Sequence, residues 1–331
     1  MIKFGVELVP NVSVDKILDL ALIIENLNFN YLWITDHYMN RNAYIILSTI
    51  LYKTSKIKLG VGISNPYTTH PAWLASLIGT LSEISNGRVA LGLGSGDKTT
   101  LESIGISREK PLTTVKEALI IVKKLLSGDI VNFEGEVFKL RNAKLNFTPP
   151  KVPIYIGAQA PKMLELAGQL GDGVLINASH PEIIQELLKH VKKGLEKSNR
   201  NIKEIDITAC TCISIDSDVE KAKKAVKPII AFIIAGTRDE ILIKYDINMS
   251  KVSSIREELS RGNIQKAVDY VDDDMISYFS ITGNLNNCLE RIKEILKREV
   301  SHIVFGSPLG PKKKDSLKML KEIKDKIIHE E

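Results

Sequence analysis

Short apolar stretches alternate along this chain with longer segments in which apolar residues recur at helical spacing. A buried parallel strand reads as a short apolar run, and the helix that crosses to the next strand reads as an amphipathic segment. The alternation predicts parallel β/α units, and eight such units predict a (β/α)8 TIM barrel. The expected strands are residues 3–8, 31–35, 58–63, 88–94, 154–157, 173–176, 205–215 and 301–305.

Helices are expected between these strands. The clearest covers residues 111–127, where Val115, Ala118, Val122 and Leu125 form one apolar stripe. The others are expected at residues 14–27, 43–52, 73–84, 163–170, 183–197, 219–234, 285–297 and 311–331.

Two segments fit no β/α unit. Residues 130–140 alternate like a β-hairpin around Glu134-Gly135. Residues 237–277 are polar and have the pattern of a helix only in pieces. We therefore expect one domain over residues 1–331, with insertions near 129–150 and 237–277.

Composition narrows the class of protein. The 331 residues carry 45 basic and 40 acidic side chains, a net charge of +5, without the basic stripe and interleaved aromatics of a nucleic-acid-binding protein. Three cysteines without paired spacing argue against a disulfide framework. The six histidines show no metal-ligand spacing, so no metal is expected. The N-terminus has no signal pattern, and no apolar run of about 18 residues occurs, so we expect a soluble, cytoplasmic protein.

Polar residues at the strand ends are the candidate catalytic groups, because catalytic groups of a barrel gather at the carboxyl ends of its strands. Glu7 ends the first strand. Removal from water there raises a carboxyl pKa toward neutrality and suits the group to general acid catalysis. The alternative is a glutamate bonded to neighbouring loop amides. Asp36 and His37 end the second strand, where they either bind a ligand or cap and pack against the next helix.

Glycines mark the third and fourth strands. Gly60 and Gly62 interrupt an otherwise β-branched strand, which indicates a bulge or close backbone approach, or tight packing inside the barrel. Residues 91–97 contain Gly-x-Gly-x-Gly. The dinucleotide-binding fingerprint needs Gly-x-Gly-x-x-Gly at the start of a helix, so a strand end lying against a ligand is the better interpretation.

The stretch 155–161 is the best candidate for anion binding. Gly157, Ala158 and Gln159 leave backbone amides open, and Pro161 stands where a helix begins. Asn177 and Ser179, after the next strand, complete this predicted phosphate site. No Walker lysine motif is present, which excludes a nucleoside triphosphatase.

Taken together, these motifs resemble the bacterial luciferase-like family. The resemblance rests on the segments 34–37, 62–66, 88–96 and 157–159 in this order, and it runs nearly from end to end. It implies a (β/α)8 barrel with insertions that assembles as a homo-oligomer, a dimer or tetramer. The implied cofactor is coenzyme F420, a 5-deazaflavin that carries a phosphate and a glutamyl tail.

The resemblance also implies roles for the strand-end residues. A non-prolyl cis peptide is expected at Gly62-Ile63, in the bulge of the third strand. Asp36 is expected to bond the polar edge of the cofactor. The other expected cofactor contacts are Gly62, Ile63, Ser64 and Asn65 at the ring, Gly157, Ala158, Gln159 and Asn177 at the tail and phosphate, and Gly94.

The implied reaction is reduction of 5,10-methylenetetrahydromethanopterin to its 5-methyl form by hydride transfer from reduced F420. Opening the substrate ring to an iminium cation requires a proton on the departing nitrogen, and Glu7 is the expected acid. Asp97 is expected to steady the cation or the pterin. The alternatives are another F420-dependent dehydrogenase or an FMN monooxygenase of the same family, and a non-catalytic flavin-binding protein.

Overall fold

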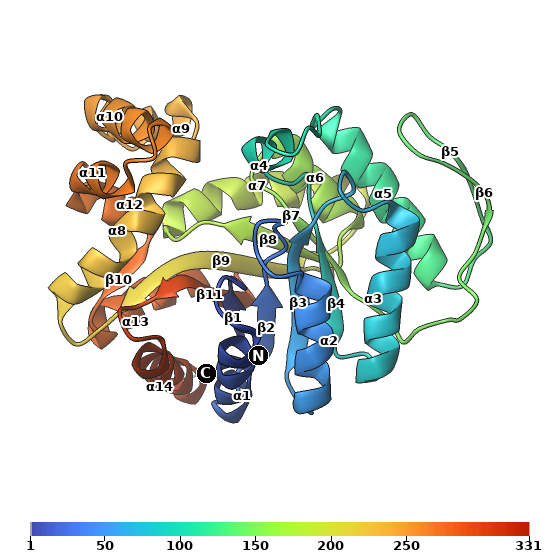
Figure 1. The fold of residues 1–331 in the computed structure, drawn as a ribbon, viewed down its shortest axis with the longest axis horizontal. Coiled ribbons are helices and arrows are strands. Elements are labelled where there is room, and N and C mark those ends of the chain that lie inside the picture. The colour runs from blue at the N-terminus through green and yellow to red at the C-terminus, as the bar shows by residue number, and fades with distance from the viewer. Residues whose placement is uncertain (1, 331) are drawn as a thin grey trace. The chain divides into compact units, whose positions relative to one another are not determined.

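The computed structural model describes residues 2–330 (Figure 1). Nine strands form one sheet in the order β10-β9-β11-β1-β2-β3-β4-β7-β8, and β9 also pairs with β8, so eight strands form a closed order with β10 beside β9. This confirms the (β/α)8 barrel. The strands are β1 Lys3–Leu8, β2 Tyr31–Ile34, β3 Lys58–Ser64, β4 Val89–Leu93, β7 Ile154–Gly157, β8 Gly173–Asn177, β9 Asp206–Ile215, β10 Ile281–Gly283 and β11 His302–Leu309.

The described residues fall into two compact units. The first contains Gly5–Ile176 and Leu187–Thr208, and the second contains residues 2–4, Asn177–Glu186 and residues 209–330. Strands β1 and β9 pass from one unit to the other. The single domain expected for residues 1–331 stays a prediction.

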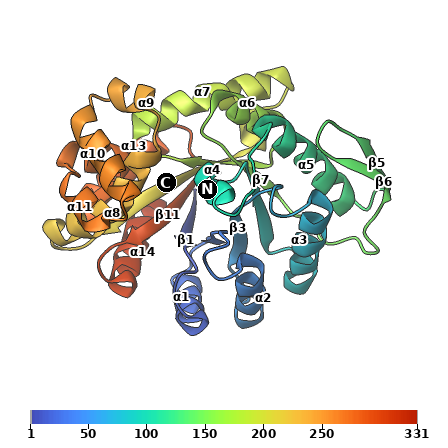
Figure 2. The ribbon, with the colours of Figure 1, turned by 45° about the horizontal axis from the view of Figure 1, so that its top comes forward.

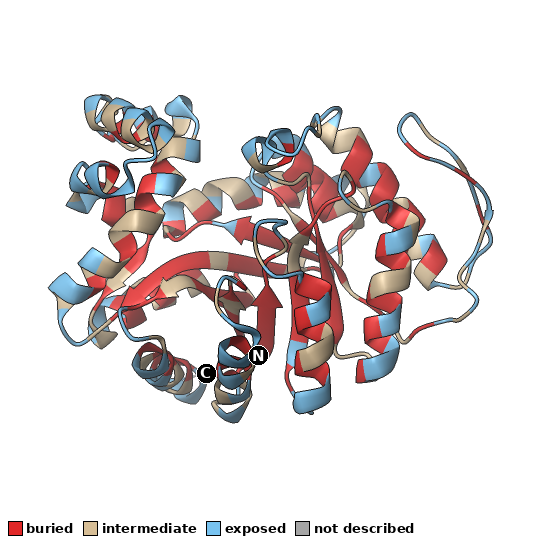
Figure 3. Cartoon of the chain, viewed as in Figure 1, coloured by how far each residue is buried: buried red, intermediate tan, exposed pale blue. Residues whose placement is uncertain are grey.

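In the first unit, helices lie outside the strands that they connect (Figure 2). Residues of the parallel strands in this unit are mostly buried (Figure 3), as expected of strands covered on both faces. Sequence explains the helix starts: Asn42 caps α2 through its side chain, and His70 caps α3 with Pro71 in its first turn. The helices are α1 Val14–Asn26, α2 Ala43–Lys53, α3 Pro71–Ser85, α4 Lys98–Glu102, α5 Pro111–Leu126 and α6 Pro161–Leu170.

Aromatic rings of β2 and β7 pack against one another in a layer. Trp33 lies 5.8 Å from Tyr31 and 5.2 Å from Tyr155, measured between ring centroids. A Cβ added to Gly60 would stand 2.2 Å from the Trp33 ring, and one added to Gly173 would stand 2.2 Å from the Tyr155 ring. The expectation of tight packing is confirmed at Gly60, where only a hydrogen atom fits beside the indole.

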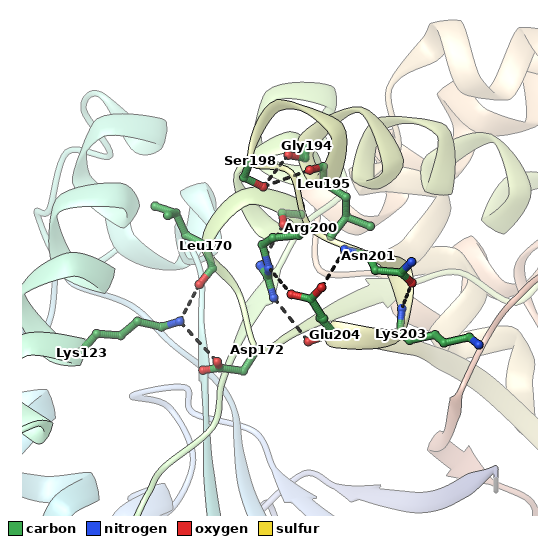
Figure 4. A network of polar contacts seen from close by, with 11 residues as sticks. Lys123, Leu170, Asp172, Gly194, Leu195, Ser198, Arg200, Asn201, Lys203 and Glu204 are labelled. Carbon is green, nitrogen blue, oxygen red and sulfur yellow. Dashed lines mark hydrogen bonds and ion pairs between the residues drawn. The ribbon is translucent and has the colours of Figure 1, made fainter.

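Charged side chains fasten the carboxyl end of α6 (Figure 4). The Lys123 ammonium donates to the carbonyl of Leu170 at 2.6 Å, and the Arg200 guanidinium donates to the carbonyl of Gly168 at 2.9 Å. Terminal carbonyls of a helix lack partners inside it, and cations complement the negative end of its dipole. These contacts hold the turn that leads into β8.

The predicted hairpin is confirmed as β5 Val131–Glu134 and β6 Lys139–Ala143, which ends three residues later than expected. The buried carboxylate of Glu117 in α5 accepts hydrogen bonds from the backbone amides of Glu136, Val137 and Phe138. These three bonds lower the pKa of Glu117 although its burial opposes them. The tip of the hairpin is thereby attached to α5.

The second unit is built on α8 Val219–Gly236, whose buried residues Val226, Ile230 and Ile234 share a core with four short helices. The expected helical pieces of residues 237–277 are confirmed as α9 Asp239–Lys244, α10 Met249–Ser260, α11 Ile264–Asp269 and α12 Asp273–Phe279. The remaining helices of the described chain are α7 Pro181–Lys197, the 3-10 turn Ile202–Glu204, α13 Leu285–Leu296 and α14 Lys313–Glu330. Glu331, the last residue of the predicted closing helix, lies outside the described residues.

Two differences from expectation lie here. The strand expected at residues 301–305 continues through 306–308 as β11, whose last residue, Leu309, is buried. Strand β10, beside β9, was not predicted at all. None of the helices in residues 2–330 is long and apolar enough to cross a membrane.

Candidate active site

The Glu7 carboxyl is a partly buried acid without a partner. Strand pairing sets Glu7 opposite Trp33, so it lies at the aromatic layer of the first unit. Within residues 2–330 no group donates a hydrogen bond to it or pairs with its charge. Removal from water raises its pKa from 4.5 to about 7. Bonding of Glu7 to loop amides is therefore not what the structure shows, and the group can hold and release a proton near neutral pH.

The end of β3 contains the predicted bulge. Pairing of β3 with β4 shifts register between Val61 and Ser64, and the peptide bond Gly62-Ile63 is cis. This confirms both expectations for the strand. The strand was expected to end at residue 63, but Ser64 is its last residue and is fully buried.

Glycines in β4, directly after β4 and in β7 make room for the side chain of Ile63. A Cβ on Gly94 would stand 2.3 Å from the Ile63 Cδ1 atom, and one on Gly157 would stand 2.7 Å from it. A Cβ on Gly92 would stand 2.9 Å from the Ile63 Cγ2 atom. The Gly-x-Gly of β4 thus makes room for a residue of the bulge, and Ile63 brings the ends of three strands together.

Asp36 is joined to this bulge by hydrogen bonds. The Ser64 hydroxyl donates to Asp36 Oδ2 and is itself 2.7 Å from the hydroxyl of Tyr44 in α2. Burial raises the pKa of Asp36, while the Ser64 hydrogen bond and the nearby His37 lower it in part. The result is a half-buried carboxyl at the edge of the bulge. His37 itself is exposed.

Asn65 and Asp97 shape local turns. The Asn65 Oδ1 atom accepts from the amides of Tyr67 at 3.1 Å and Thr68 at 3.0 Å. Asp97 is exposed and accepts from the amide of Thr100 at 2.7 Å as the N-cap of α4. A short helix does follow the Gly-x-Gly-x-Gly segment, contrary to expectation. The catalytic role of Asp97 stays a prediction.

In the predicted phosphate-binding segment, residues 157–159, one backbone amide that was expected to be open is not. The backbone amide of Ala158 donates to the carbonyl of Leu175 at 3.1 Å, so it is not open. Gln159 is exposed, and α6 begins beyond it with no side-chain hydrogen bond at its N-cap. In the second unit, Asn177 is exposed at the end of β8, and the Ser179 hydroxyl accepts from the amide of Cys212 at 2.9 Å. The cofactor roles of these residues stay predictions.

The geometry at these strand ends agrees with the comparison with known proteins. The model of the luciferase-like monooxygenase family matches residues 1–302. The chain belongs to this family. The family resemblance, first inferred from the order of the motifs, is therefore confirmed.

Relatives within the family are similar over nearly the whole chain. The 5,10-methylenetetrahydromethanopterin reductase of Archaeoglobus fulgidus is 44% identical over 330 residues, which cover 98% of this chain and 99% of the relative. The reductase of the same name from Methanopyrus kandleri is 38% identical, with 96% of each chain covered. The solved structure of the coenzyme F420 dependent tetrahydromethanopterin reductase from Methanopyrus kandleri superposes with a TM-score of 0.93 at 37% identity and covers 97% of each chain.

Two residues near this luciferase-like site were missed by the sequence analysis. Tyr44 lies 20 positions before Ser64, within an apolar helical run that gave no sign of a polar contact. The Thr35 hydroxyl is buried and has no hydrogen-bond partner within residues 2–330. A buried hydroxyl is visible only once the strand end has been placed, so no signal in the sequence could have identified either group.

Proposed function

We propose that this chain reduces 5,10-methylenetetrahydromethanopterin to 5-methyltetrahydromethanopterin with hydride from reduced coenzyme F420. The observation that carries the proposal is the unpartnered carboxyl of Glu7, protonated near neutral pH, in a chain that is 44% identical to a reductase of this name. The acid is the group that this reaction needs and that a simple binding protein does not.

The residues present fit a deazaflavin. Gly62 and Ile63 are partly exposed at the bulge, where their backbone offers a surface for a flat ring. Asp36 uses one carboxylate oxygen for Ser64, and its Oδ1 atom accepts no hydrogen bond from residues 2–330. That oxygen suits an N–H donor on the polar edge of the cofactor. Gly157 and Gln159 would hold the tail.

Glu7 supplies the proton in the proposed mechanism. The bound reduced cofactor supplies a hydride from its C5 position. The methylene carbon of the substrate lies between two nitrogens and accepts hydride poorly until one C–N bond opens. Glu7 gives its proton to the departing nitrogen, the C–N bond breaks, and a carbon–nitrogen iminium cation results. Glu7 is left as a carboxylate, which favours the cation nearby.

Positioning is the second contribution of the chain. Hydride transfer needs donor and acceptor about 3–3.5 Å apart. The bulge is held by the packing of Ile63 against Gly94 and Gly157, so it presents a defined surface rather than a loose loop. Asp97 is proposed to favour the cationic form of the substrate through its negative charge. Its Oδ1 atom accepts the N-cap hydrogen bond of α4, and the side chain is otherwise exposed.

The test is a spectrophotometric assay with reduced F420 and methylenetetrahydromethanopterin. We expect oxidation of the deazaflavin that depends on the pterin. Assays with secondary alcohols and glucose 6-phosphate, each with oxidised F420, test other F420-dependent activities. An assay with FMN, reductant and oxygen tests a monooxygenase. Binding of F420 without turnover of any substrate would favour a non-catalytic protein.

Assembly and location are further parts of the proposal. The family resemblance supports a homo-oligomer, a dimer or tetramer, and the cytoplasm is the proposed location. Light scattering coupled to size-exclusion chromatography measures the mass in solution, and a monomeric mass that does not change with concentration would contradict the oligomer.

A further inference from the structure

Three side chains from three elements form one line of hydrogen bonds. The Tyr44 hydroxyl in α2 is 2.7 Å from Ser64 Oγ at the end of β3, and Ser64 Oγ donates to Asp36 Oδ2 after β2. Ser64 has a single hydroxyl proton, which it gives to Asp36. The Tyr44 hydroxyl must therefore be the donor to Ser64. Both protons point along the line toward the Asp36 carboxylate.

The same serine also fixes the bulge. Its carbonyl oxygen accepts a hydrogen bond from the amide of Gly94 at 2.9 Å. Ser64 follows directly after the cis peptide Gly62-Ile63 and has no exposed surface. The backbone of Ser64 thus joins the bulge to β4, while its side chain joins the bulge to Asp36 and α2.

We propose that Tyr44 is a positioning residue for the cofactor, acting through Ser64 on Asp36. This inference rests on the proposed function, because it takes Asp36 as a ligand of the deazaflavin. Donation from Tyr44 holds the Ser64 hydroxyl in the rotamer that reaches Asp36 Oδ2. That contact fixes the Asp36 side chain and leaves Oδ1 for an N–H donor of the deazaflavin ring.

The charge of Asp36 explains how this line of hydrogen bonds stabilises its carboxylate. Burial disfavours the ionised carboxylate, and the neighbouring His37 and the Ser64 hydroxyl are the groups that favour it. A hydroxyl that accepts a hydrogen bond is polarised and donates its own proton more strongly. Ser64 accepts from Tyr44 and therefore donates more strongly to Asp36. Without the Tyr44 hydroxyl, the buried Ser64 oxygen loses its donor and the serine can turn away from Asp36.

The test compares Tyr44→Phe with Tyr52→Phe. Both replace a tyrosine of α2, but Tyr52 is exposed and lies outside the line. Affinity for oxidised F420 is measured by isothermal titration calorimetry, and melting of the cofactor-free protein by circular dichroism. Loss of one hydrogen bond that acts on a charged group predicts a Kd raised about tenfold in Tyr44→Phe. Tyr52→Phe should bind as the wild type does.

A double-mutant cycle separates positioning from a general structural role. If Tyr44 acts through Asp36, Tyr44→Phe should weaken binding in the wild-type background and change little in an Asp36→Asn background. Equal losses in both backgrounds would mean that Tyr44 acts on the fold alone and would overturn the inference, as would unchanged affinity in Tyr44→Phe.

The pH dependence gives an independent readout. The hydrogen bond from Ser64 lowers the pKa of Asp36. Because Tyr44→Phe weakens that bond, it should raise the pKa of Asp36 further. If the ionised form binds the cofactor, affinity will be lost at a higher pH in the variant as the pH is lowered. The His37→Gln variant, tested in parallel, removes the other side chain that favours the charged form of Asp36. An unshifted profile in Tyr44→Phe would count against the inference. If the wild type binds no F420, the proposed function fails instead.

Discussion

At the scale of single residues, the proposed chemistry depends on one proton held by Glu7. Glu7 lies beside Trp33 without a hydrogen-bond partner within residues 2–330, and removal from water raises its pKa to about 7. A paired carboxylate would have been ionised at this pH and unable to act as an acid. The sequence indicated the position of the acid, but the absence of a partner became evident only from the structure.

Replacing Glu7 with glutamine tests its role directly. Gln has nearly the same shape and cannot give up a proton, so kcat should fall by about 10²–10⁴, the usual contribution of a general acid. Affinity for F420 should not change. Steady-state kinetics and calorimetry measure the two quantities, and Glu83→Gln on the exposed surface of α3 is the matched control. A Glu7→Gln variant with normal kcat would exclude Glu7 from the mechanism.

The pKa of Glu7 also predicts how the rate changes with pH. An acid must be protonated to act, so kcat/KM for the pterin should be highest below pH 7 and should fall as the pH rises through about 7. Rates are measured at saturating cofactor from pH 5 to 9. A rate that rises through this range would show that the essential form of the group is the base.

Stability should respond to the same proton. The pKa of Glu7 is higher in the folded chain than in the unfolded chain, so the folded state binds more protons and the stability falls as the pH rises from 4.5 to about 7. The free energy of unfolding of Glu7→Gln, relative to that of the wild type, should therefore increase from pH 5 to pH 8. Partial solvent access reduces the effect to about 1–2 kcal/mol. Urea denaturation at both pH values measures it, and an equal difference at both would contradict the raised pKa.

At the scale of elements, the bulge of β3 depends on glycines in its neighbours. Gly94→Ala would place a methyl group 2.3 Å from the end of the Ile63 side chain and force that side chain to move. Overpacking of this kind costs about 1–3 kcal/mol. Because the displaced residue belongs to the proposed ring surface, we expect the Kd for F420 to rise about tenfold while the fold is kept.

Gly236→Ala is the control for this prediction. Gly236 ends α8, and an added Cβ there meets no atom within 4 Å. Its affinity for F420 should equal that of the wild type, and its melting temperature should be equal or slightly higher. Unchanged affinity for F420 in Gly94→Ala would mean that Ile63 does not contribute to cofactor binding.

The elements themselves were largely predictable, because strands buried on both faces and amphipathic helices leave strong patterns. The failures have physical causes. Strand β10 has only three residues, Ile281–Gly283, too few to show a period. Strand β11 continues through Gly306-Ser307-Pro308 because Leu309 is still buried beyond them. The small residues and the proline indicated the end of the strand, but the buried strand continues through them.

At the scale of the whole molecule, the site could be predicted only as a set of strand ends. A barrel brings the ends of its strands together, so Glu7, Asp36 and Gly94 were expected near one another although they are far apart in sequence. Contacts between a strand end and a helix follow no such rule. The bond from Tyr44 to Ser64 depends on how α2 lies beside β3, and the sequence does not encode that as a pattern.

The protonation state of Glu7 also bears on the choice between oxidation of an alcohol and reduction of a methylene bridge. Oxidation of an alcohol needs a base that takes the hydroxyl proton, whereas opening of a methylene bridge needs an acid. At pH 6 the Glu7 carboxyl, with its pKa raised to about 7, is mostly protonated and therefore suits only the second reaction.

We therefore expect turnover of methylenetetrahydromethanopterin with reduced F420 at pH 6. Under the same conditions, reduction of oxidised F420 by glucose 6-phosphate or propan-2-ol should stay at the rate of the enzyme-free control. Both reactions are followed by the deazaflavin absorbance. Alcohol-dependent reduction at a comparable rate would mean that another group acts as base, and the protonated carboxyl would then not determine which reaction the barrel performs.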